Sequence, residues 1–259
     1  VATVQGQALM DELLIGSHTS KLKTLPETIT SLQDFTRPWQ IFLGGPQNSK
    51  LHISDEELAQ TRALVEQHDA QVFVHSQYII NLCQTPGADD DYHTALLIKN
   101  LQYAQAAGFK GVVVHVGKST DKPIKDALHN MRTNLQTALQ HASETCPILL
   151  ETPAGQGSET LTDITEFIEF VLHFQDPRLR ICVDTCHVFA AGVSPFQYVE
   201  RITKYNKKLL RLIHFNDSAT PCGSCLDRHA FIGMGHIGID EMTKVGRHCH
   251  GYKVPMLIE

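Results

Sequence analysis

Residues able to bind a metal ion recur at the same point of a repeated pattern. Six short apolar runs, rich in β-branched residues, each end in a histidine or an acid: His75, His115, Glu151, Asp184, His214 and Glu259. Imidazole and carboxylate together form a ligand set that suits Zn²⁺, and also Mn²⁺ or Fe²⁺. One such residue alone would ordinarily be a capped or salt-bridged polar group. Its repetition at the end of six runs instead predicts a metal site.

Two short motifs add further donors. His187 follows Asp184 by three residues, and Asp227 and His229 flank Arg228 in a segment whose alternate side chains share a face if it is extended. The full set contains five histidines and four carboxylates: His75, His115, Glu151, Asp184, His187, His214, Asp227, His229 and Glu259. Nine donors exceed the four ligands of one tetrahedral zinc ion, so they predict a cluster of two or three ions.

The apolar runs also indicate the fold. Continuous short apolar runs are typical of strands buried on both faces, as in a parallel sheet. We predict strands at 13–15 and 41–43 and strands that end at residues 75, 115, 151, 184, 214 and 259. Helix-start signals such as the capping box that opens at Ser54 predict helices between them. These helices are expected from residue 24 onward and over 54–68, 89–107, 123–144, 161–174, 195–206 and 240–248.

Eight strands alternating with seven helices predict an α/β protein with a single (βα)₈ TIM barrel, and 259 residues is a typical length for one. We therefore expect one domain over residues 1–259. The carboxyl ends of barrel strands open onto one rim, where catalysis takes place, so the donors would gather there. An eighth helix is missing after Glu259, and Val1 is an unusual start. We expect the chain to be a fragment of a longer protein.

Composition narrows the class of protein. No apolar run approaches the roughly 18 residues of a membrane span, residues 1–10 carry no secretory signal, and seven scattered cysteines argue against a disulfide framework. We expect a cytoplasmic or nuclear protein that does not bind membranes. The net charge of −6 is opposite to the usual footprint of nucleic-acid-binding proteins. Three bound divalent ions would offset it, so charge does not decide the substrate.

Longer motifs resemble the endonuclease IV family of apurinic/apyrimidinic endonucleases. The resemblance runs from about Ile15 to Glu259 and is carried by 75–82 (HSQYIINL), 151–157 (ETPAGQG), 184–192 (DTCHVFAAG), 214–217 (HFND), 227–229 (DRH) and 233–238 (GMGHIG). It implies a zinc-dependent barrel that cuts the DNA backbone on the 5′ side of an abasic site and leaves a 3′-hydroxyl. It also implies removal of blocking groups from 3′ ends.

The resemblance further implies three zinc ions and their ligands. The first ion would be held by His75, His115 and Glu151. Glu151 would bridge to the second, whose other ligands are Asp184, His214 and Glu259. The third would be held by His187, Asp227 and His229.

These ions suggest a mechanism for the cleavage. A water molecule between two zinc ions loses its proton near neutral pH and becomes the nucleophile. The resulting hydroxide would attack the phosphorus in line, without a covalent enzyme intermediate. Glu151 and Glu259 would be the catalytic carboxylates, with Glu259 orienting the nucleophile. The third ion would bind the scissile phosphate and stabilise the leaving 3′-oxygen.

The expected partner is double-stranded DNA with abasic or 3′-blocked sites. By resemblance, the loop that carries Tyr78 and Ile79 enters the DNA at the lesion, as an apolar wedge that unstacks a flipped nucleotide. Many relatives carry a DNA-entering Arg after the second strand, where this chain has Gln47 and Asn48 in its place. Arg228 stands between two proposed ligands and is either a phosphate contact or a rim salt bridge. A barrel needs no partner to close, so we expect a monomer.

Two other classes of protein remain open. The first is a metal-dependent sugar isomerase or epimerase of the xylose-isomerase type, which shares the barrel but needs no third trio such as His187, Asp227 and His229. The second is a metal-holding DNA-binding protein without catalysis, which would be expected to have lost some of the nine donors.

Two features are not assigned a function. Cys222 and Cys225 form one C-x-x-C motif without a second pair, and we interpret them as loop thiols rather than a fourth metal site. The basic residues Lys204, Lys207, Lys208 and Arg211 fall at the bottom of the predicted barrel. We interpret them as a solvated helix end.

Overall fold

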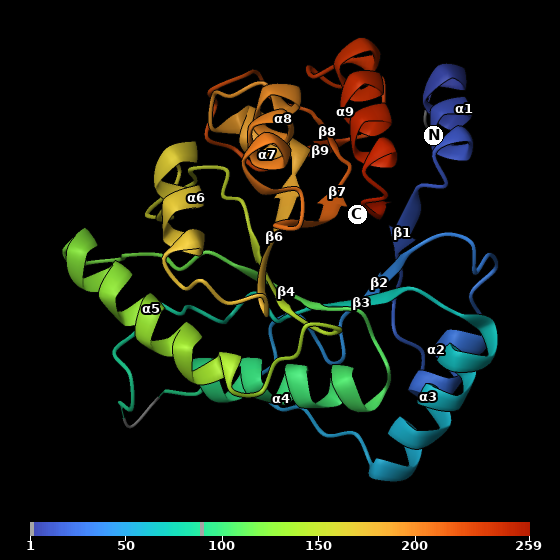
Figure 1. Cartoon of the computed structure of the whole chain (residues 1–259), viewed down its shortest axis with the longest axis vertical. Helices are drawn as coiled ribbons and strands as arrows, with labels where there is room; N and C mark the ends of the chain where they lie inside the picture. Colours follow the sequence, from blue (N-terminus) through green and yellow to red (C-terminus); the bar gives the residue numbers. More distant parts are fainter. Residues whose placement is uncertain (1–2, 89–90) are drawn as a thin grey trace.

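The computed structural model describes residues 3–88 and 91–259, which form a closed parallel barrel (Figure 1). The barrel strands are β1 (Gly16–His18), β2 (Trp39–Ile41), β3 (Val72–His75), β4 (Val112–His115), β5 (Ile148–Glu151), β6 (Leu179–Asp184), β7 (Leu210–His214) and β10 (Met256–Ile258). Each strand pairs with its neighbour along the chain, and β10 pairs with β1 to close the ring. The predicted (βα)₈ fold is confirmed.

Helices surround the strands, and seven of them, all except α1 and α7, correspond to helices predicted from the sequence. They are α1 (Val4–Glu12), α2 (Leu25–Thr30), α3 (Asp55–His68), α4 (His93–Ala106), α5 (Ile124–Leu139), α6 (Ile164–Leu172), α7 (Thr185–Ala190), α8 (Pro195–Asn206) and α9 (Ile239–Gly251). The Ser54 hydroxyl caps α3 by accepting the Glu57 backbone N–H at 3.2 Å. None of the helices in the described residues is long and apolar enough to cross a membrane.

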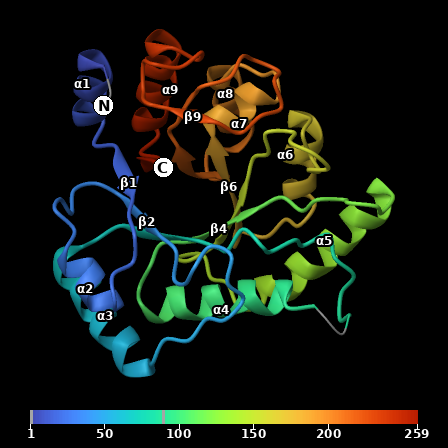
Figure 2. The same cartoon turned by 180° about the vertical axis from the view of Figure 1, so that it is seen from behind.

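The first two strands differ from the prediction. The prediction placed them at 13–15 and 41–43, but they are Gly16–His18 and Trp39–Ile41. Leu13 caps the end of α1, and Leu14 has a φ of 52°, so this apolar stretch forms a helix end and a turn rather than a strand. The prediction missed α1, whose residues show little apolar periodicity. It lies beside α9, as Figures 1 and 2 both show.

Other boundaries differ by a few residues. The third predicted helix was expected to start at Asp89, which lies outside the described residues, and the corresponding helix α4 begins at His93. The short helix α7 and the antiparallel pair of β8 (Asp217–Ser218) and β9 (His229–Ala230) were not predicted. They form in the long connections after β6 and β7.

The interior of the barrel determines where the donors point. One apolar residue from each of six strands forms a fully buried cluster inside the ring: Phe73, Val113, Leu149, Cys182, Leu212 and Leu257. Side chains two residues apart on a strand share a face. The residues two positions further on are His75, His115, Glu151, Asp184, His214 and Glu259. The strands therefore project all six strand-end donors into the barrel mouth, above this cluster.

Candidate metal centre

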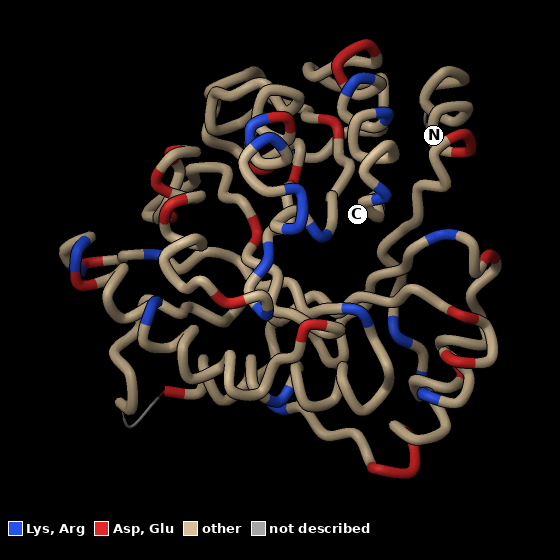
Figure 3. Tube along the Cα trace, viewed as in Figure 1, with Lys and Arg blue, Asp and Glu red and all other residues tan. Residues whose placement is uncertain are grey.

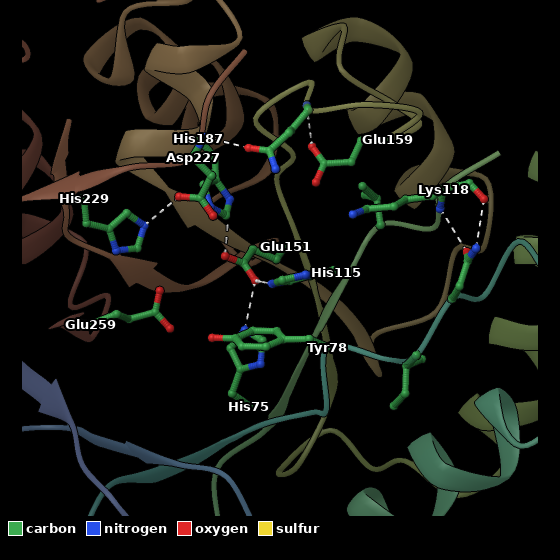
Figure 4. A pocket seen from close by; sticks show the side chains of 14 residues that line it. His75, Tyr78, His115, Lys118, Glu151, Glu159, His187, Asp227, His229 and Glu259 are labelled. Carbon is green, nitrogen blue, oxygen red and sulfur yellow. Dashed lines mark hydrogen bonds and ion pairs between the residues drawn. The ribbon is translucent and has the colours of Figure 1, made fainter. Parts of the chain in front are cut away.

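A cavity of about 360 Å³ opens at the barrel mouth, and Figure 4 shows the donors that line it. The nine predicted donors fall into groups whose ligand atoms lie within 4.8 Å of one another. These groups include the three sets that the family resemblance implied. No predicted ligand lies away from the cluster.

The first set joins β3, β4 and β5. His75 Nε2 lies 3.2 Å from Glu151 Oε2, and His115 Nε2 lies 3.1 Å from the same oxygen. The His75 ring is oriented by its other nitrogen, since Nδ1 lies 2.7 Å from the Ser76 carbonyl oxygen. Such a partner on the second nitrogen is usual for metal-binding histidines. The arrangement leaves Nε2 of both rings directed at the carboxylate.

The second set uses the other oxygen of the same carboxylate. His214 Nδ1 lies 3.1 Å from Glu151 Oε1 and 3.2 Å from Glu259 Oε2. Asp184 Oδ2 lies 3.8 Å from the same His214 nitrogen. Glu151 therefore faces the first set with Oε2 and the second with Oε1, so this one carboxylate could serve both donor sets.

The third set depends on α7 and on the loop before β9. Asp184 caps α7 by accepting the His187 backbone N–H at 2.9 Å, and this turn brings His187 back over the barrel mouth. Asp227 lies between two rings, with Oδ2 at 3.1 Å from His187 Nε2 and Oδ1 at 3.1 Å from His229 Nε2. His187 Nδ1 lies 2.8 Å from the Thr152 carbonyl oxygen, which fixes the ring. Contacts within the protein thus orient His187, Asp227 and His229 toward one another.

Electrostatics of the cluster favour binding of cations. Burial lowers the pKa of His187, but the charge of Asp184 and the hydrogen bond with Asp227 outweigh it and raise that pKa well above 6.5. Burial raises the pKa of Glu151, but the histidines His115 and His214 outweigh it and lower that pKa well below 4.5. The buried carboxylates thus attract protons to the imidazoles. Divalent ions, which bind neutral imidazole, would displace these protons, so the donor set fits a metal cluster.

Two polar side chains that support the donors were not predicted. Gln40 on β2 is fully buried, and its amide contacts both His214, at 2.8 Å, and Glu259, at 2.7 Å. Asn216 Nδ2 donates to Asp184 Oδ2 at 2.8 Å, and its Oδ1 accepts the Glu259 backbone N–H at 3.0 Å. Gln40 was not predicted because the second strand was expected to begin at residue 41. Asn216 lies in the quoted HFND motif, which was the signal available for it.

The cysteines are distinct from these sets. Cys186 forms a further group with Asp184 and His229, whose ligand atoms lie within 4.8 Å of one another. Its thiol donates to the Arg228 carbonyl oxygen at 3.4 Å, and burial raises its pKa to about 12. Cys222 and Cys225 are exposed, and neither belongs to a metal-ligand group within the described part of the chain.

The predicted DNA-binding residues lie around the mouth. Tyr78 is 48% exposed, and its ring stacks on His115 with 5.4 Å between ring centres. Ile79 is half-buried against the core. Gln47 and Asn48 are exposed on a loop tied to the Tyr78 loop, because the Tyr78 backbone N–H donates to the Pro46 carbonyl oxygen at 2.9 Å. The exposed Arg228 donates to the Asp227 carbonyl oxygen at 2.6 Å.

Comparison with known proteins first identifies the general class. Residues 38–259 match the family model described as a xylose isomerase-like TIM barrel. The crystal structure of endonuclease IV from Thermus thermophilus superposes with a TM-score of 0.80, covers 95% of this chain and 91% of its own, and is 24% identical. This likeness supports the fold.

Sequence comparison identifies the family. An endonuclease 4 of Acanthamoeba polyphaga mimivirus is 33% identical over 85% of this chain and 76% of its own length. An endonuclease 4 of Listeria monocytogenes serotype 4b is 32% identical over 95% of this chain and 87% of its own length. The chain belongs to the endonuclease IV family of the xylose isomerase-like TIM barrels.

Proposed function

We propose that this protein is a zinc-dependent DNA-repair endonuclease that hydrolyses the phosphodiester on the 5′ side of an abasic site and leaves a 3′-hydroxyl. Removal of blocking groups from 3′ ends uses the same site. The observation that carries the proposal is Glu151, whose two oxygens each face a separate set of donors at 3.1–3.2 Å, with a third set beside them. Adjacent divalent ions are the usual machinery for in-line displacement at phosphorus.

Each of the three donor sets would hold one ion. One zinc ion would be held by His75, His115 and Glu151; a second by Glu151, Asp184, His214 and Glu259; and a third by His187, Asp227 and His229. Zn²⁺ is the best match to this mixture of imidazole and carboxylate, with Mn²⁺ or Fe²⁺ as alternatives at some sites. When bound, such ions neutralise phosphate charge and lower the pKa of water.

The protein's own side chains orient the reacting groups. Glu259 Oε1 accepts a hydrogen bond from the Gln40 amide at 2.7 Å, and the Glu259 backbone N–H donates to Asn216 Oδ1. These contacts leave Glu259 Oε2 facing His214 Nδ1 at 3.2 Å. This fixed carboxylate would orient the attacking water by accepting a hydrogen bond from it. Glu151 is buried at the base of the cavity and keeps the first two donor sets in register.

Substrate binding would follow from the shape of the mouth. The cavity is recessed, so the abasic sugar must leave the helix to reach the donors. Tyr78 would occupy the space left in the duplex, with Ile79 supporting its loop from beneath. Gln47, Asn48 and Arg228 are exposed around the same opening and would contact the DNA backbone. We expect a monomer of the cytoplasm or nucleus that binds double-stranded DNA.

A sugar isomerase or epimerase is the alternative, since the barrel family includes such enzymes by name. The third donor set argues against it. His187, Asp227 and His229 are oriented beside the first two sets, and a two-carbon hydride or proton shift has no use for a further phosphate-binding ion. An isomerase or epimerase activity would therefore not account for the third donor set.

The test is incision of a duplex that carries one tetrahydrofuran abasic analogue, by the zinc-loaded protein, resolved on a sequencing gel. This analogue cannot undergo β-elimination, so a cut with a 3′-hydroxyl end reports hydrolysis. We expect incision that a chelator abolishes and that Glu259→Gln greatly reduces. Lys204→Gln, a surface change away from the cavity, is the matched control. If zinc-loaded parent protein leaves the duplex intact, the proposal fails and sugar epimerisation is the activity to assay.

A further inference from the structure

A second cavity lies at the opposite end of the barrel, where the strands begin. It has a volume of about 440 Å³, and five basic side chains line it: Lys110, Arg180, Lys208, Arg211 and Lys253. They lie at or just before the starts of β4, β6, β7 and β10, which are distant in sequence. Blue Lys and Arg segments lie close together around β6 and β7 in the middle of Figure 3. Convergence from four strands distinguishes this cavity from a solvated helix end.

An irregularity in the sheet directs one of these side chains. Ile181 pairs with Leu210 and Cys182 with Leu212, so Arg211 is an extra residue on β7 with no partner on β6. A β-bulge of this kind re-aims the extra side chain. The Arg211 guanidinium carbon lies 5.9 Å from the centre of the Phe73 ring, which belongs to the cluster inside the barrel. The bulge thus places a cation beneath the barrel interior.

The basic side chains lack paired counter-charges. Among the described residues, none of the five forms a salt bridge with a carboxylate, Glu144 on the same wall included, and the Arg211 guanidinium makes no hydrogen bond. Arg180 donates to the Lys208 carbonyl oxygen at 2.9 Å. Burial, and after it the charge of Arg180, lowers the pKa of Arg211. The Arg211 guanidinium is half-buried beside a second cation, and a bound anion would offset this repulsion and accept hydrogen bonds from its free donors.

We propose that this cavity binds a small phosphate-bearing anion, independently of the metal centre. Two guanidinium groups can grip phosphate oxygens in the bidentate manner typical of arginine, and the lysines add charge around them. The volume suits a phosphate with a small attached group rather than a nucleic-acid duplex. Tyr252 lines the same cavity and is 44% exposed, so its ring offers a stacking surface if that group is an aromatic base. Inorganic phosphate and a nucleoside monophosphate are the two sources of this chemistry.

The test is isothermal titration of the zinc-loaded full chain with inorganic phosphate and, separately, with adenosine monophosphate. Arg211→Gln and Arg180→Gln each remove one phosphate-gripping group, and we expect each to weaken binding at least about tenfold. Lys204→Gln is the matched control, since Lys204 pairs with Glu200 at 3.2 Å and does not line the cavity. It should bind as the parent does. Tighter binding of adenosine monophosphate than of phosphate would identify a nucleotide as the ligand class.

Phosphate held at the metal centre would contribute equally in all four proteins, because none of the changes touches that centre. Equal affinities across the four, or no binding by the parent, would therefore overturn the proposal. Thermal melts followed by circular dichroism show whether Arg211→Gln folds. Should it not fold, Arg180→Gln decides alone, because Arg180 is on the cavity wall and its loss leaves the bulge intact.

Discussion

The amide of Gln40 accepts a hydrogen bond from His214 Nε2 at 2.8 Å, and this contact fixes which nitrogen of the ring is free. Glu259 can only accept, so the Gln40 nitrogen must face it and the Gln40 oxygen must face His214. The Nε2 proton is thereby committed, so Nδ1 is the nitrogen that faces Glu151 and Glu259 and that would become the ligand atom when a metal ion displaces its proton. A buried residue without direct access to the cavity thus sets the ligand atom of a candidate metal-binding histidine.

We predict that Gln40→Ala weakens zinc binding at the second site by about 10- to 100-fold, the usual effect of losing a partner of a ligating histidine. Gln40→Glu keeps an acceptor for His214 but places a second carboxylate against Glu259, so it should restore less than full affinity. Competition with a fluorescent chelator measures both. Parent-like zinc affinity in Gln40→Ala would show that the ring is oriented by its other contacts alone.

The donor sets predict a graded loss of metal. The Asp227 carboxylate contacts His187 and His229, its partners in the third set, so Asp227→Ala should retain two of the three expected zinc equivalents. Glu151 serves two sets, so Glu151→Ala should lose more. Atomic emission analysis of dialysed protein gives the stoichiometry. The Cys222→Ser/Cys225→Ser double variant is the control, and zinc loss from it would contradict our interpretation of that motif as loop thiols.

Tyr78 is predicted to act on the DNA and not on the metal. Tyr78→Ala should weaken binding to abasic duplex by roughly 1–3 kcal/mol, the range found for loss of one base-stacking aromatic, with unchanged zinc content. Tyr252→Ala removes a tyrosine of similar exposure at the opposite end of the barrel and serves as the control. Fluorescence anisotropy with labelled duplex measures both. Equal affinity of Tyr78→Ala and parent would mean that the ring only packs on His115.

Lys118 is predicted to contact a DNA phosphate. It lines the metal cavity, is exposed, and forms no salt bridge among the described residues, while Asn81 holds its backbone on both sides at 2.9 and 3.0 Å. Figure 4 shows its side chain directed toward the donors. Lys118→Gln should reduce the slope of log affinity against log salt by about 0.9. Lys122→Gln is the control because its amine already donates to Gln84, and a parent-like slope for Lys118→Gln would remove Lys118 from the interface.

The sequence was sufficient to predict the barrel and to place the six strand-end donors at its mouth, because the carboxyl ends of barrel strands meet there. His187, Asp227 and His229 lie on α7 and in the connection after β7, whose structure was not predicted. In a parallel barrel, a residue at the carboxyl end of a strand lies at the mouth. His75 and Glu151 can therefore be placed together without any information on side-chain packing. Gln40 could not be found in this way. Its role depends on β1 lying between β2 and β10, which brings a residue near the start of the chain against Glu259 at its end. The start of β1 was misjudged because Leu13 and Ile15 are as apolar as a strand would be.

The Asp217 carboxylate joins the two ends of the segment that carries Asp227 and His229 of the third donor set. Asp217 accepts backbone N–H groups of Gly233, Gly235 and Ile237 at 3.0–3.1 Å, and a side chain on Gly235 would collide with that carboxylate. The segment between Asp217 and Gly233 therefore begins and ends at the same hydrogen-bonded point. Its outer half, with Cys222 and Cys225, is held on α7, because the Gly223 and Cys225 backbone N–H groups donate to the Phe189 and Ala190 carbonyl oxygens at 3.1 and 2.9 Å. The segment therefore braces the helix that carries His187 as well as presenting Asp227 and His229.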